Sequence, residues 1–326
     1  MSEAATACIG AGRMGRGIAQ CMAYAGHDIA LIDAKPRTDE DFDRFRKETL
    51  AEVEAGLTMV ADIGGFDVAV LPDLMKRVSV YPVAKAEQGL SGAHIVFEAV
   101  PEVLDAKKHA FGLFNDHADS DAILASTTST MLSTELAQYC SDPARFLNAH
   151  WLNPALLVPL VELSPAEQTS DAVLADLTGF LEGIGKVPVT CKASPGYIVP
   201  RIQALAMNEA ARLVEEGVAS AEDVDRAVKY GFGMRFAVLG LLEFIDWGGG
   251  DILYHASNYM AGATGEDRFA PPQIVNDKMK SGETGLRAGR GFFDYAGRDV
   301  PAYQKDRMGA FLNALKQAGL HRPPSA

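Results

Sequence analysis

Gly10-Ala11-Gly12-Arg13-Met14-Gly15 joins an apolar run at residues 4–9 to a helix-like run at residues 18–24. The three glycines form a G-x-G-x-x-G pattern in the strand–turn–helix context that this pattern requires. The first glycine permits the tight turn, the second lets the backbone approach a pyrophosphate, and the third lets helix and strand pack closely. The start of the helix offers free N–H groups to phosphates. The stretch therefore predicts a dinucleotide-binding turn, and an ordinary strand-to-helix turn is the alternative.

An acidic residue, Asp33, follows a second apolar run at residues 29–32 and lies 18 positions after Gly15. A carboxylate at this distance accepts hydrogen bonds from the adenosine ribose and repels a 2′-phosphate, so it favours NAD over NADP. Lys35 and Arg37 lie close by in the sequence and keep NADP open, and a loop-capping role is the alternative for Asp33. The residues expected to bind NAD here are Gly10, Gly12, Met14, Gly15 and Asp33.

The composition is that of an ordinary globular protein, with 326 residues of which 48% are hydrophobic and 22% charged. The net charge of −13 and the lack of a basic block argue against nucleic-acid and membrane-surface partners. No apolar run approaches the roughly 20 residues that span a bilayer. The first strand begins too early for a signal peptide, and four scattered cysteines indicate reduced thiols. We therefore expect a cytoplasmic protein whose partner is a small molecule.

Short apolar runs alternate with helical patterns up to about residue 190. The expected strands are residues 5–9, 28–32, 77–80, 95–98, 123–126, 146–150, 158–163 and 187–190. Helical patterns cover residues 103–117 and 171–184, and a long insert at residues 38–76 is partly helical. This alternation predicts an α/β fold with a Rossmann-type, doubly wound parallel sheet.

Lys192-Ala193-Ser194-Pro195-Gly196 interrupts both patterns and predicts a linker. Beyond it the expected helices are residues 198–216, 221–230, 251–260, 271–280 and 303–317. The sequence thus predicts an NAD-binding domain at residues 1–191 and an all-helical C-terminal domain for substrate and dimerisation at residues 192–326. Residues 239–245 are strongly apolar, which indicates domain core or a dimer seam.

One carboxylate, Glu162, stands inside the apolar run at residues 158–163. Burying a lone carboxylate is costly, so it requires a partner. His150 ends the preceding predicted strand, and Asn153-Pro154 marks a turn between the two strands. If the strands are neighbours, Glu162 can hold one imidazole nitrogen and leave the other free to take a proton. The pattern predicts a general-base pair, whereas the other histidines are assigned ordinary core or surface roles.

A run of hydroxyl side chains, Ser126-Thr127-Thr128-Ser129-Thr130, follows the predicted strand at residues 123–126. It lies at the carboxyl edge of the sheet, where ligands bind in open α/β folds. These hydroxyls can hold a substrate oxygen, and helix capping before Leu132 is the alternative for several of them. The sequence shows no set of residues with metal-ligand spacing, so no metal is expected.

Together these features resemble the 3-hydroxyacyl-CoA dehydrogenase family. The matching motifs are the Gly-rich turn, Glu98-Ala99-Val100-Pro101-Glu102 with Lys107, Ser126-Thr127-Thr128-Ser129, His150 with Asn153-Pro154, Glu162, Pro195-Gly196-Tyr197-Ile198 and Gly289-Arg290-Gly291-Phe292-Phe293-Asp294-Tyr295. They cover nearly the whole chain in the family's order. The resemblance implies NAD-dependent interconversion of an L-3-hydroxyacyl and a 3-ketoacyl group. It also implies a homodimer formed through the helical C-terminal domain.

The resemblance assigns roles to the matching residues. It implies that His150 is the base, that Glu162 orients it and that Ser129 binds the C3 oxygen of the substrate. It places Glu102 and Lys107 near the nicotinamide end of NAD. The hydride would move between substrate C3 and nicotinamide C4, so the cofactor carries the redox chemistry and the protein supplies orientation and a proton acceptor.

Three places depart from the family pattern. Pro200 stands where the family has a substrate-binding Asn, and proline has no side-chain donor to replace it. Thr127 replaces the Asn usual in the hydroxyl run. The insert at residues 38–76, where the family recognises CoA, carries acidic residues that offset its cations. Phosphate groups favour cationic partners, so the insert is poorly suited to CoA.

Gly231-Phe232-Gly233-Met234-Arg235-Phe236 also differs from the acyl-CoA pattern. It is similar to relatives that act on free acids, the L-gulonate dehydrogenase (lambda-crystallin) and carnitine dehydrogenase branches. Arg235 can pair with a carboxylate through two parallel hydrogen bonds, and a structural salt bridge or a carbonyl contact is an equal alternative. We therefore expect a short 3-hydroxy acid or a similarly small acid as substrate. The expected substrate contacts are Ser129, Asn153 and Arg235.

Two other functions stay open at this point. One is an L-3-hydroxyacyl-CoA dehydrogenase of fatty-acid degradation, in which Pro200 is a tolerated variation. The other is a non-catalytic structural or sensor protein that binds NAD. The pairing of His150 with Glu162 argues against the second function, because neither residue is needed merely to hold NAD.

Overall fold

The computed structural model describes residues 6–324, and the chain forms two compact units, Met1–Ala206 and Met207–Ala326. The division falls inside helix α8 (Val199–Glu215). The sequence predicts a domain boundary at residues 191/192, just after the last strand. This boundary between the two functional domains stays a prediction. Each unit is described below by itself.

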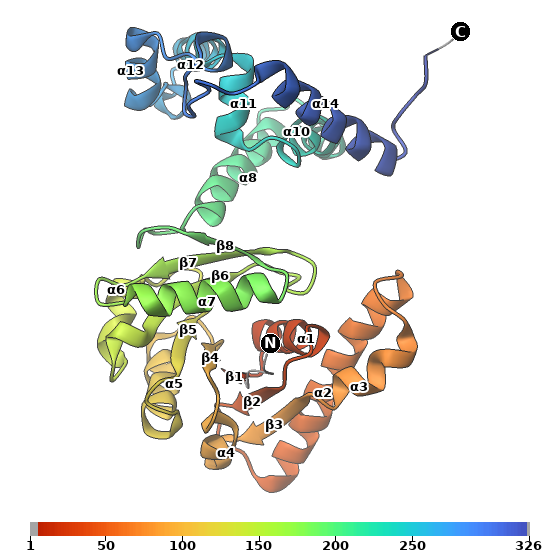
Figure 1. Ribbon diagram of the computed structural model, residues 1–326, viewed down its shortest axis with the longest axis vertical. Helices are drawn as coiled ribbons and strands as arrows, with labels where there is room; N and C mark the ends of the chain where they lie inside the picture. The colour runs from red at the N-terminus through yellow and green to blue at the C-terminus, as the bar shows by residue number, and fades with distance from the viewer. Residues whose placement is uncertain (1–5, 325–326) are drawn as a thin grey trace. The chain divides into compact units, whose positions relative to one another are not determined.

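An eight-stranded sheet in the order β3-β2-β1-β4-β5-β6-β7-β8 forms the centre of the first unit (Figure 1). Its strands are β1 (Thr6–Ile9), β2 (Ile29–Asp33), β3 (Val78–Pro82), β4 (Ile95–Glu98), β5 (Ile123–Ser126), β6 (Phe146–Trp151), β7 (Leu160–Pro165) and β8 (Val187–Thr190). All eight predicted strands are present with ends shifted by at most two residues, except that Ala5 lies outside the described residues. The prediction of a Rossmann-type sheet is confirmed.

The pairing of β6 with β7 is antiparallel, whereas the other neighbouring strands pair in parallel. The prediction of a wholly parallel sheet was therefore wrong at this pair. The physical reason is the short connection at residues 152–159, because a parallel pair needs a crossover of a dozen or more residues. The antiparallel register sets His150 directly opposite Glu162.

Seven helices of this unit flank the sheet. They are α1 (Arg13–Tyr24), α2 (Asp39–Asp62), α3 (Leu71–Met75), α4 (Ala86–Leu90), α5 (Leu104–His117), α6 (Ser133–Leu136) and α7 (Asp171–Gly183). The insert at residues 38–76 is mostly the long helix α2, which Thr38 caps by accepting a hydrogen bond from Asp41 N–H. Acidic residues in its first turn suit the positive end of the helix dipole.

The core of the first unit lies on both faces of the sheet. In β1, Ala7 and Ile9 belong to one hydrophobic cluster and Cys8 to the other. This alternation follows from the period of two in a strand, and burial of both faces explains why the strands are rich in apolar residues. Because both faces of the sheet are covered, a ligand is expected at the carboxyl ends of the strands, where open α/β sheets bind ligands.

The second unit is helical. Its elements are the second half of α8, α9 (Ala221–Ala227), a π-helical segment (Val228–Gly233), α10 (Met234–Phe236), α11 (Leu241–Gly248), α12 (Gly250–Thr264), α13 (Gln273–Ser281) and α14 (Val300–Gln317). The sequence predicted α8, α9, α12, α13 and α14, but it did not identify α11 as a helix. Among residues 6–324 no helix has both the length and the apolarity needed to cross a membrane.

Asp246 on α11 explains the aromatic motif at residues 289–295. This carboxylate is 2% exposed and accepts hydrogen bonds from the N–H groups of Phe292 and Phe293 at 2.9 and 2.8 Å. The hydroxyl of Tyr295 donates to it at 3.2 Å. The motif therefore has a structural role within the second unit, because it satisfies a buried charge.

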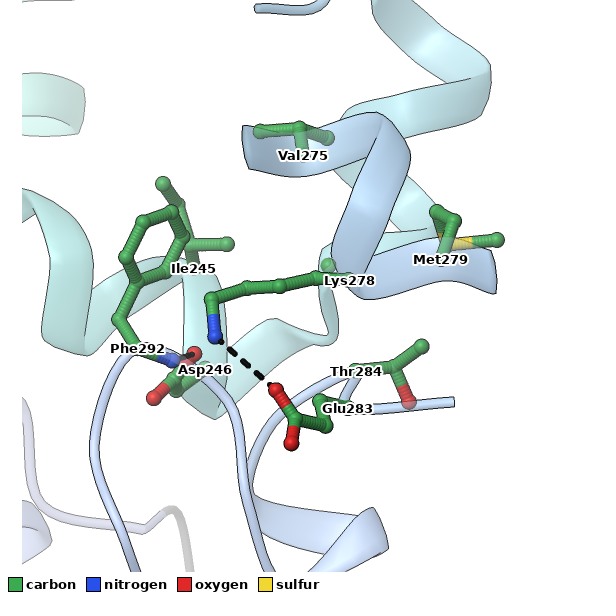
Figure 2. Close-up of a pocket in the computed structure, with 9 residues that line it drawn as sticks. Ile245, Asp246, Val275, Lys278, Met279, Glu283, Thr284 and Phe292 are labelled. Carbon is green, nitrogen blue, oxygen red and sulfur yellow. Dashed lines mark hydrogen bonds and ion pairs between the residues drawn. The ribbon is translucent and has the colours of Figure 1, made fainter. Parts of the chain in front are cut away.

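The neighbouring pocket supports the same arrangement. Figure 2 shows Lys278 of α13 directed toward Glu283, in a pocket that Asp246 also lines. The Lys278 ammonium lies 3.4 Å from a carboxylate oxygen of Glu283 and also donates to the carbonyl of Gly291. A side chain on Gly291 would overlap the carboxylate of Asp246, so glycine is required there. Lys278 and Glu283 thus pair with each other, and this pair serves to hold the fold.

Candidate active site

The Gly-rich turn leaves open space at one of its three glycines. Gly10 has φ +110°, and a Cβ there would overlap the backbone of Ala99. A Cβ on Gly15 would overlap the carbonyl oxygen of Gly10, so these two positions serve the turn and the packing. A Cβ on Gly12 would meet only the carbonyl oxygen of Ala99, at 4.0 Å. The second glycine thus leaves space for a ligand at the start of α1, as the pyrophosphate of a dinucleotide requires.

Asp33 lies at the carboxyl end of β2 and lines the same groove as the Gly-rich turn. Its side chain is buried, with one oxygen accepting from Nε of Arg37 and the other from the N–H of Lys35 at 3.3 Å. The Arg37 guanidinium also lies over the ring of Phe45, 4.2 Å from its centroid. The guanidinium of Arg37, one of the two cations that kept NADP open, is therefore paired with Asp33, which favours NAD at this end of the groove.

A buried ion pair connects β4 to α5. The carboxylate of Glu98, 0% exposed, accepts hydrogen bonds from Nζ of Lys107 at 3.1 and 3.0 Å. The N–H of Val100 and the hydroxyl of Ser126 donate to the same carboxylate. Lys107 is 1% exposed, so its ammonium contacts these protein groups rather than the open pocket. The sequence reasoning assigned no role to Glu98, although it ends an apolar run just as Glu162 interrupts one.

Glu102 connects this buried pair to the hydroxyl run. Thr128 donates its hydroxyl to Glu102 at 2.8 Å, and Ser129 donates both its N–H and its hydroxyl, the latter at 3.0 Å. Lys107 lies 3.5 Å away. Although partial burial opposes it, the N–H of Ser129 and the charge of Lys107 hold the pKa of Glu102 below its usual value. Glu102 is therefore an ionised carboxylate that orients the Ser129 loop.

His150 and Glu162 meet as the sequence predicted. Nδ1 of His150 lies 2.8 Å from Oε2 of Glu162, and the two side chains are 7% and 0% exposed. A carboxylate only accepts hydrogen bonds, so Nδ1 carries the proton and Nε2 is the free nitrogen. The other oxygen of Glu162 accepts from the N–H groups of Ile198 and Val199, at 2.9 and 2.8 Å, where α8 begins. The buried carboxylate is thus fully satisfied.

Tyr197 covers the imidazole. Its ring lies parallel to that of His150, with centroids 5.1 Å apart and planes inclined by 10°. Its hydroxyl donates to the carbonyl of Thr128 at 2.9 Å and accepts from the side-chain amide of Asn148 at 3.0 Å. Tyr197 belongs to the family motif at residues 195–198, but nothing local in the sequence indicates which ring it will stack on.

One pocket gathers five of the twelve predicted site residues. Its volume is about 400 Å³, and the predicted residues that line it are Met14, Glu102, Ser129, His150 and Asn153. Arg13 lines both this pocket and the groove beside Asp33. The carboxyl edge of the sheet therefore presents a continuous set of groups, from Asp33 in the groove to His150 in the pocket.

Arg235 belongs to the second unit and is described there by itself. It follows the π-helical segment, and its Nε donates to the carbonyl of Gly231 at 2.6 Å. Its guanidinium lies over the ring of Phe244, 5.0 Å from the centroid. Within residues 6–324 no carboxylate forms an ion pair with this exposed arginine. The carbonyl contact that we considered is therefore present, and the remaining guanidinium donors are available.

Two models of known protein families match this chain. The model of the 3-hydroxyacyl-CoA dehydrogenase NAD binding domain matches residues 5–194, and the model of the 3-hydroxyacyl-CoA dehydrogenase C-terminal domain matches residues 196–295. The two models meet at the predicted linker.

Similar proteins include enzymes that act on free acids and on CoA thioesters by name. The chain is 30% identical over 303 residues to 5-formyl-3-hydroxy-2-methylpyridine 4-carboxylate 5-dehydrogenase of Mesorhizobium japonicum, covering 92% of this chain and 94% of that protein. It is 32% identical over 288 residues to a probable 3-hydroxybutyryl-CoA dehydrogenase of Deinococcus radiodurans, covering 88% and 98%.

A solved structure resembles the whole chain. The crystal structure of a 3-hydroxyacyl-CoA dehydrogenase from Archaeoglobus fulgidus has a TM-score of 0.75 and 31% identity, covering 97% of this chain and 99% of that chain. The family models, the relatives and this fold agree with the Gly-rich turn and with the domain order. The chain therefore belongs to the 3-hydroxyacyl-CoA dehydrogenase family, as an NAD-dependent dehydrogenase that acts on hydroxyl groups.

Proposed function

We propose that this dehydrogenase reversibly oxidises the 3-hydroxyl of a short 3-hydroxy acid, or of a similarly small acid, to the ketone. The observation that supports it most is the pairing of His150 with Glu162. Glu162 occupies Nδ1, so Nε2 is the nitrogen available in the pocket that Ser129 also lines. A buried imidazole with one nitrogen bound to a carboxylate and the other free is suited to general-base catalysis.

In oxidation, Nε2 of His150 takes the proton of the substrate hydroxyl. The carboxylate of Glu162 stabilises the imidazolium that forms, and the N–H groups of Ile198 and Val199 hold this carboxylate in place. The hydroxyl of Ser129 donates to Glu102 in the structure, and it donates to the C3 oxygen of the substrate once it rotates away from Glu102. NAD, when bound, supplies the acceptor for the hydride that leaves C3. Asn153, which lines the same pocket, is a second contact for the substrate.

The cofactor is held along the groove and the pocket. Gly10, Gly12, Met14 and Gly15 bind it at the start of α1, and Asp33 accepts from the adenosine ribose. Glu102 lies at the nicotinamide end of the same edge of the sheet. Lys107 supports that end through Glu102, because its ammonium is buried between carboxylates.

Three observations favour a free acid over a CoA thioester. Arg235 is exposed, is oriented by a carbonyl and an aromatic ring, and keeps donors for a carboxylate. The first turn of α2, in the insert where CoA phosphates would need cations, is acidic. The relative from Mesorhizobium japonicum is named for a pyridine carboxylate substrate. We therefore assign Arg235 to the substrate carboxylate.

The names of the Deinococcus radiodurans relative and of the Archaeoglobus fulgidus structure favour a second candidate, an L-3-hydroxyacyl-CoA dehydrogenase. One assay separates the two. NADH oxidation is followed optically with acetoacetate and with acetoacetyl-CoA at equal concentration. Preference for the free acid supports the proposal. Strong preference for the thioester would overturn it and would leave Arg235 with a structural role.

The catalytic assignment has its own test. A His150→Gln variant should bind NAD normally and lose at least about a hundredfold in kcat, since a general base contributes roughly 10²–10⁴. Full turnover in this variant would refute the role of His150.

We also propose a cytoplasmic homodimer. The four cysteines are unpaired, as in a reducing compartment, and α8 has no buried residue in the single chain.

A further inference from the structure

Tyr197 is the only non-glycine residue within residues 6–324 whose backbone has a positive φ, at 44°. An L-residue with a side chain adopts this conformation at a cost, so the surrounding structure must impose it. Here Gly196, with φ +75°, precedes it, and the N–H of Tyr197 donates to the carbonyl of Ser194 at 3.1 Å. The tight turn ends at the residues whose N–H groups hold Glu162.

The turn brings one side chain and two N–H groups onto the pair of His150 and Glu162. The ring of Tyr197 covers one face of the imidazole, while Ile198 and Val199 donate to the carboxylate. Tyr197 itself is 5% exposed. A single short segment therefore contacts both members of the proposed catalytic pair, and the strained residue is the one that stacks on the base.

The hydroxyl of Tyr197 anchors this ring at its far end. It donates to the carbonyl of Thr128, next to Ser129, and accepts from Asn148, two residues before His150 on β6. Both bonds are at ordinary length and buried, so they restrict the ring to one position. Burial, opposed in part by the Asn148 bond, raises the pKa of Tyr197 above its usual value, so its hydroxyl stays a neutral donor.

We propose that Tyr197 is a positioning residue for catalysis. Its stacked ring holds the imidazole plane of His150 against Glu162. Tyr197 acts through His150 and does not itself touch the reacting atoms. The inference rests on the proposed base role of His150.

Two variants separate the ring from the hydroxyl. Tyr197→Phe keeps the stacked ring, and we expect kcat to stay within about threefold of the wild type. Tyr197→Gly removes the ring but adopts the positive φ without strain, so the turn that serves Glu162 should persist. We expect Tyr197→Gly to lose about thirtyfold in kcat, part of the roughly 10²–10⁴ that a general base contributes, with the Kd for NAD within about twofold.

A spectroscopic readout reports the base directly. The Nδ1 proton of His150, shared with a buried carboxylate, should give a downfield proton resonance in the wild type and in Tyr197→Phe, and it should be lost or broadened in Tyr197→Gly. A double-mutant cycle completes the test. In a His150→Gln background, Tyr197→Gly should lower the residual kcat by less than about twofold, because coupled residues are not additive.

Each result has a definite meaning. The positioning role is wrong if Tyr197→Gly keeps full activity. It is also wrong if Tyr197→Gly lowers kcat by the same factor in the His150→Gln background as in the wild type. If its NAD affinity falls in step with kcat, the residue is merely structural and the inference fails. If His150→Gln itself keeps full turnover, the base assignment fails and takes this inference with it. Loss of kcat in His150→Gln together with a fully active Tyr197→Gly overturns only the role of Tyr197.

Discussion

Two buried carboxylates at this sheet edge are balanced in different ways. Glu98 forms an ion pair with the ammonium of Lys107. Glu162 accepts hydrogen bonds from the imidazole of His150 and from two N–H groups, so a positive charge on His150 would form an ion pair with it. This difference supports the proposed proton transfer at His150, because taking up a proton there completes an ion pair with Glu162.

The first prediction concerns pH. The rate of alcohol oxidation should fall on the acid side as His150 takes up a proton, since a protonated base cannot accept the hydroxyl proton. Glu102 does not contribute to this fall, because its lowered pKa keeps it ionised at any pH above its usual value of 4.5. The measurement is kcat/KM against pH, with Glu102→Gln as the control that retains the acid limb. A rate that is flat from mildly acidic to alkaline pH would contradict it.

The second prediction concerns the choice of cofactor. Asp33→Ser removes the partner of Arg37 while the stacking on Phe45 remains, so the guanidinium becomes free to bind a 2′-phosphate. The ratio of kcat/KM for NADP to that for NAD should rise at least about tenfold, as a charge-assisted hydrogen bond contributes roughly 1.5–3 kcal/mol. The double variant Asp33→Ser/Arg37→Met should lose this gain. An unchanged ratio would show that Arg37 does not reach the ribose.

At the scale of elements, the strand–turn–helix unit shows why three glycines differ. Gly10 and Gly15 meet backbone atoms, so their lack of a side chain serves the packing of β1 against α1. Gly12 faces open space. The same pattern thus contains two positions for folding and one for binding.

The third prediction separates these two functions. Gly15→Ala should lower the free energy of unfolding by at least about 2 kcal/mol, because overpacking against rigid backbone costs roughly 1–3 kcal/mol or more. Gly12→Ala should leave Tm nearly unchanged and raise the KM for NAD at least about tenfold, since its methyl group occupies space for the pyrophosphate. Thermal unfolding and NAD titration of both variants provide the comparison. Equal loss of stability in both would contradict the assignment.

Elements with a clear period were predicted well, and those without one were not. The strands and the helices α5 and α7 follow from apolar runs and helical spacing. The helix α11 was missed because its apolar stretch is too short for its period to separate helix from strand. The direction of β7 depends on the length of the connection after Trp151, which a pattern of alternating elements does not report.

At the scale of the whole molecule, α8 presents an uncovered apolar stripe. Ile202 and Leu205, three residues apart and so on one face of the helix, are 40% and 67% exposed. None of the helix's residues is buried within the single chain. A stripe of this kind favours association with a second copy of the chain.

The fourth prediction follows from this stripe. The wild-type protein should sediment as a dimer, and Ile202→Glu/Leu205→Glu should sediment as a monomer, because the charges oppose burial of the stripe. Gln203→Glu, on the same helix but between these positions, is the matched control and should remain dimeric. A wild-type mass of one chain would contradict the dimer.

The sequence by itself determined the dinucleotide turn, the order of strands and helices and the expectation that Glu162 requires a partner. These follow from local physics: backbone freedom at glycine, the periods of helix and strand, and the cost of a buried charge. Only the tertiary structure decided that Lys107 is buried against Glu98 and that Tyr197 stacks on His150. Those contacts join residues on different elements, so they depend on how all the elements pack together and not on any local stretch.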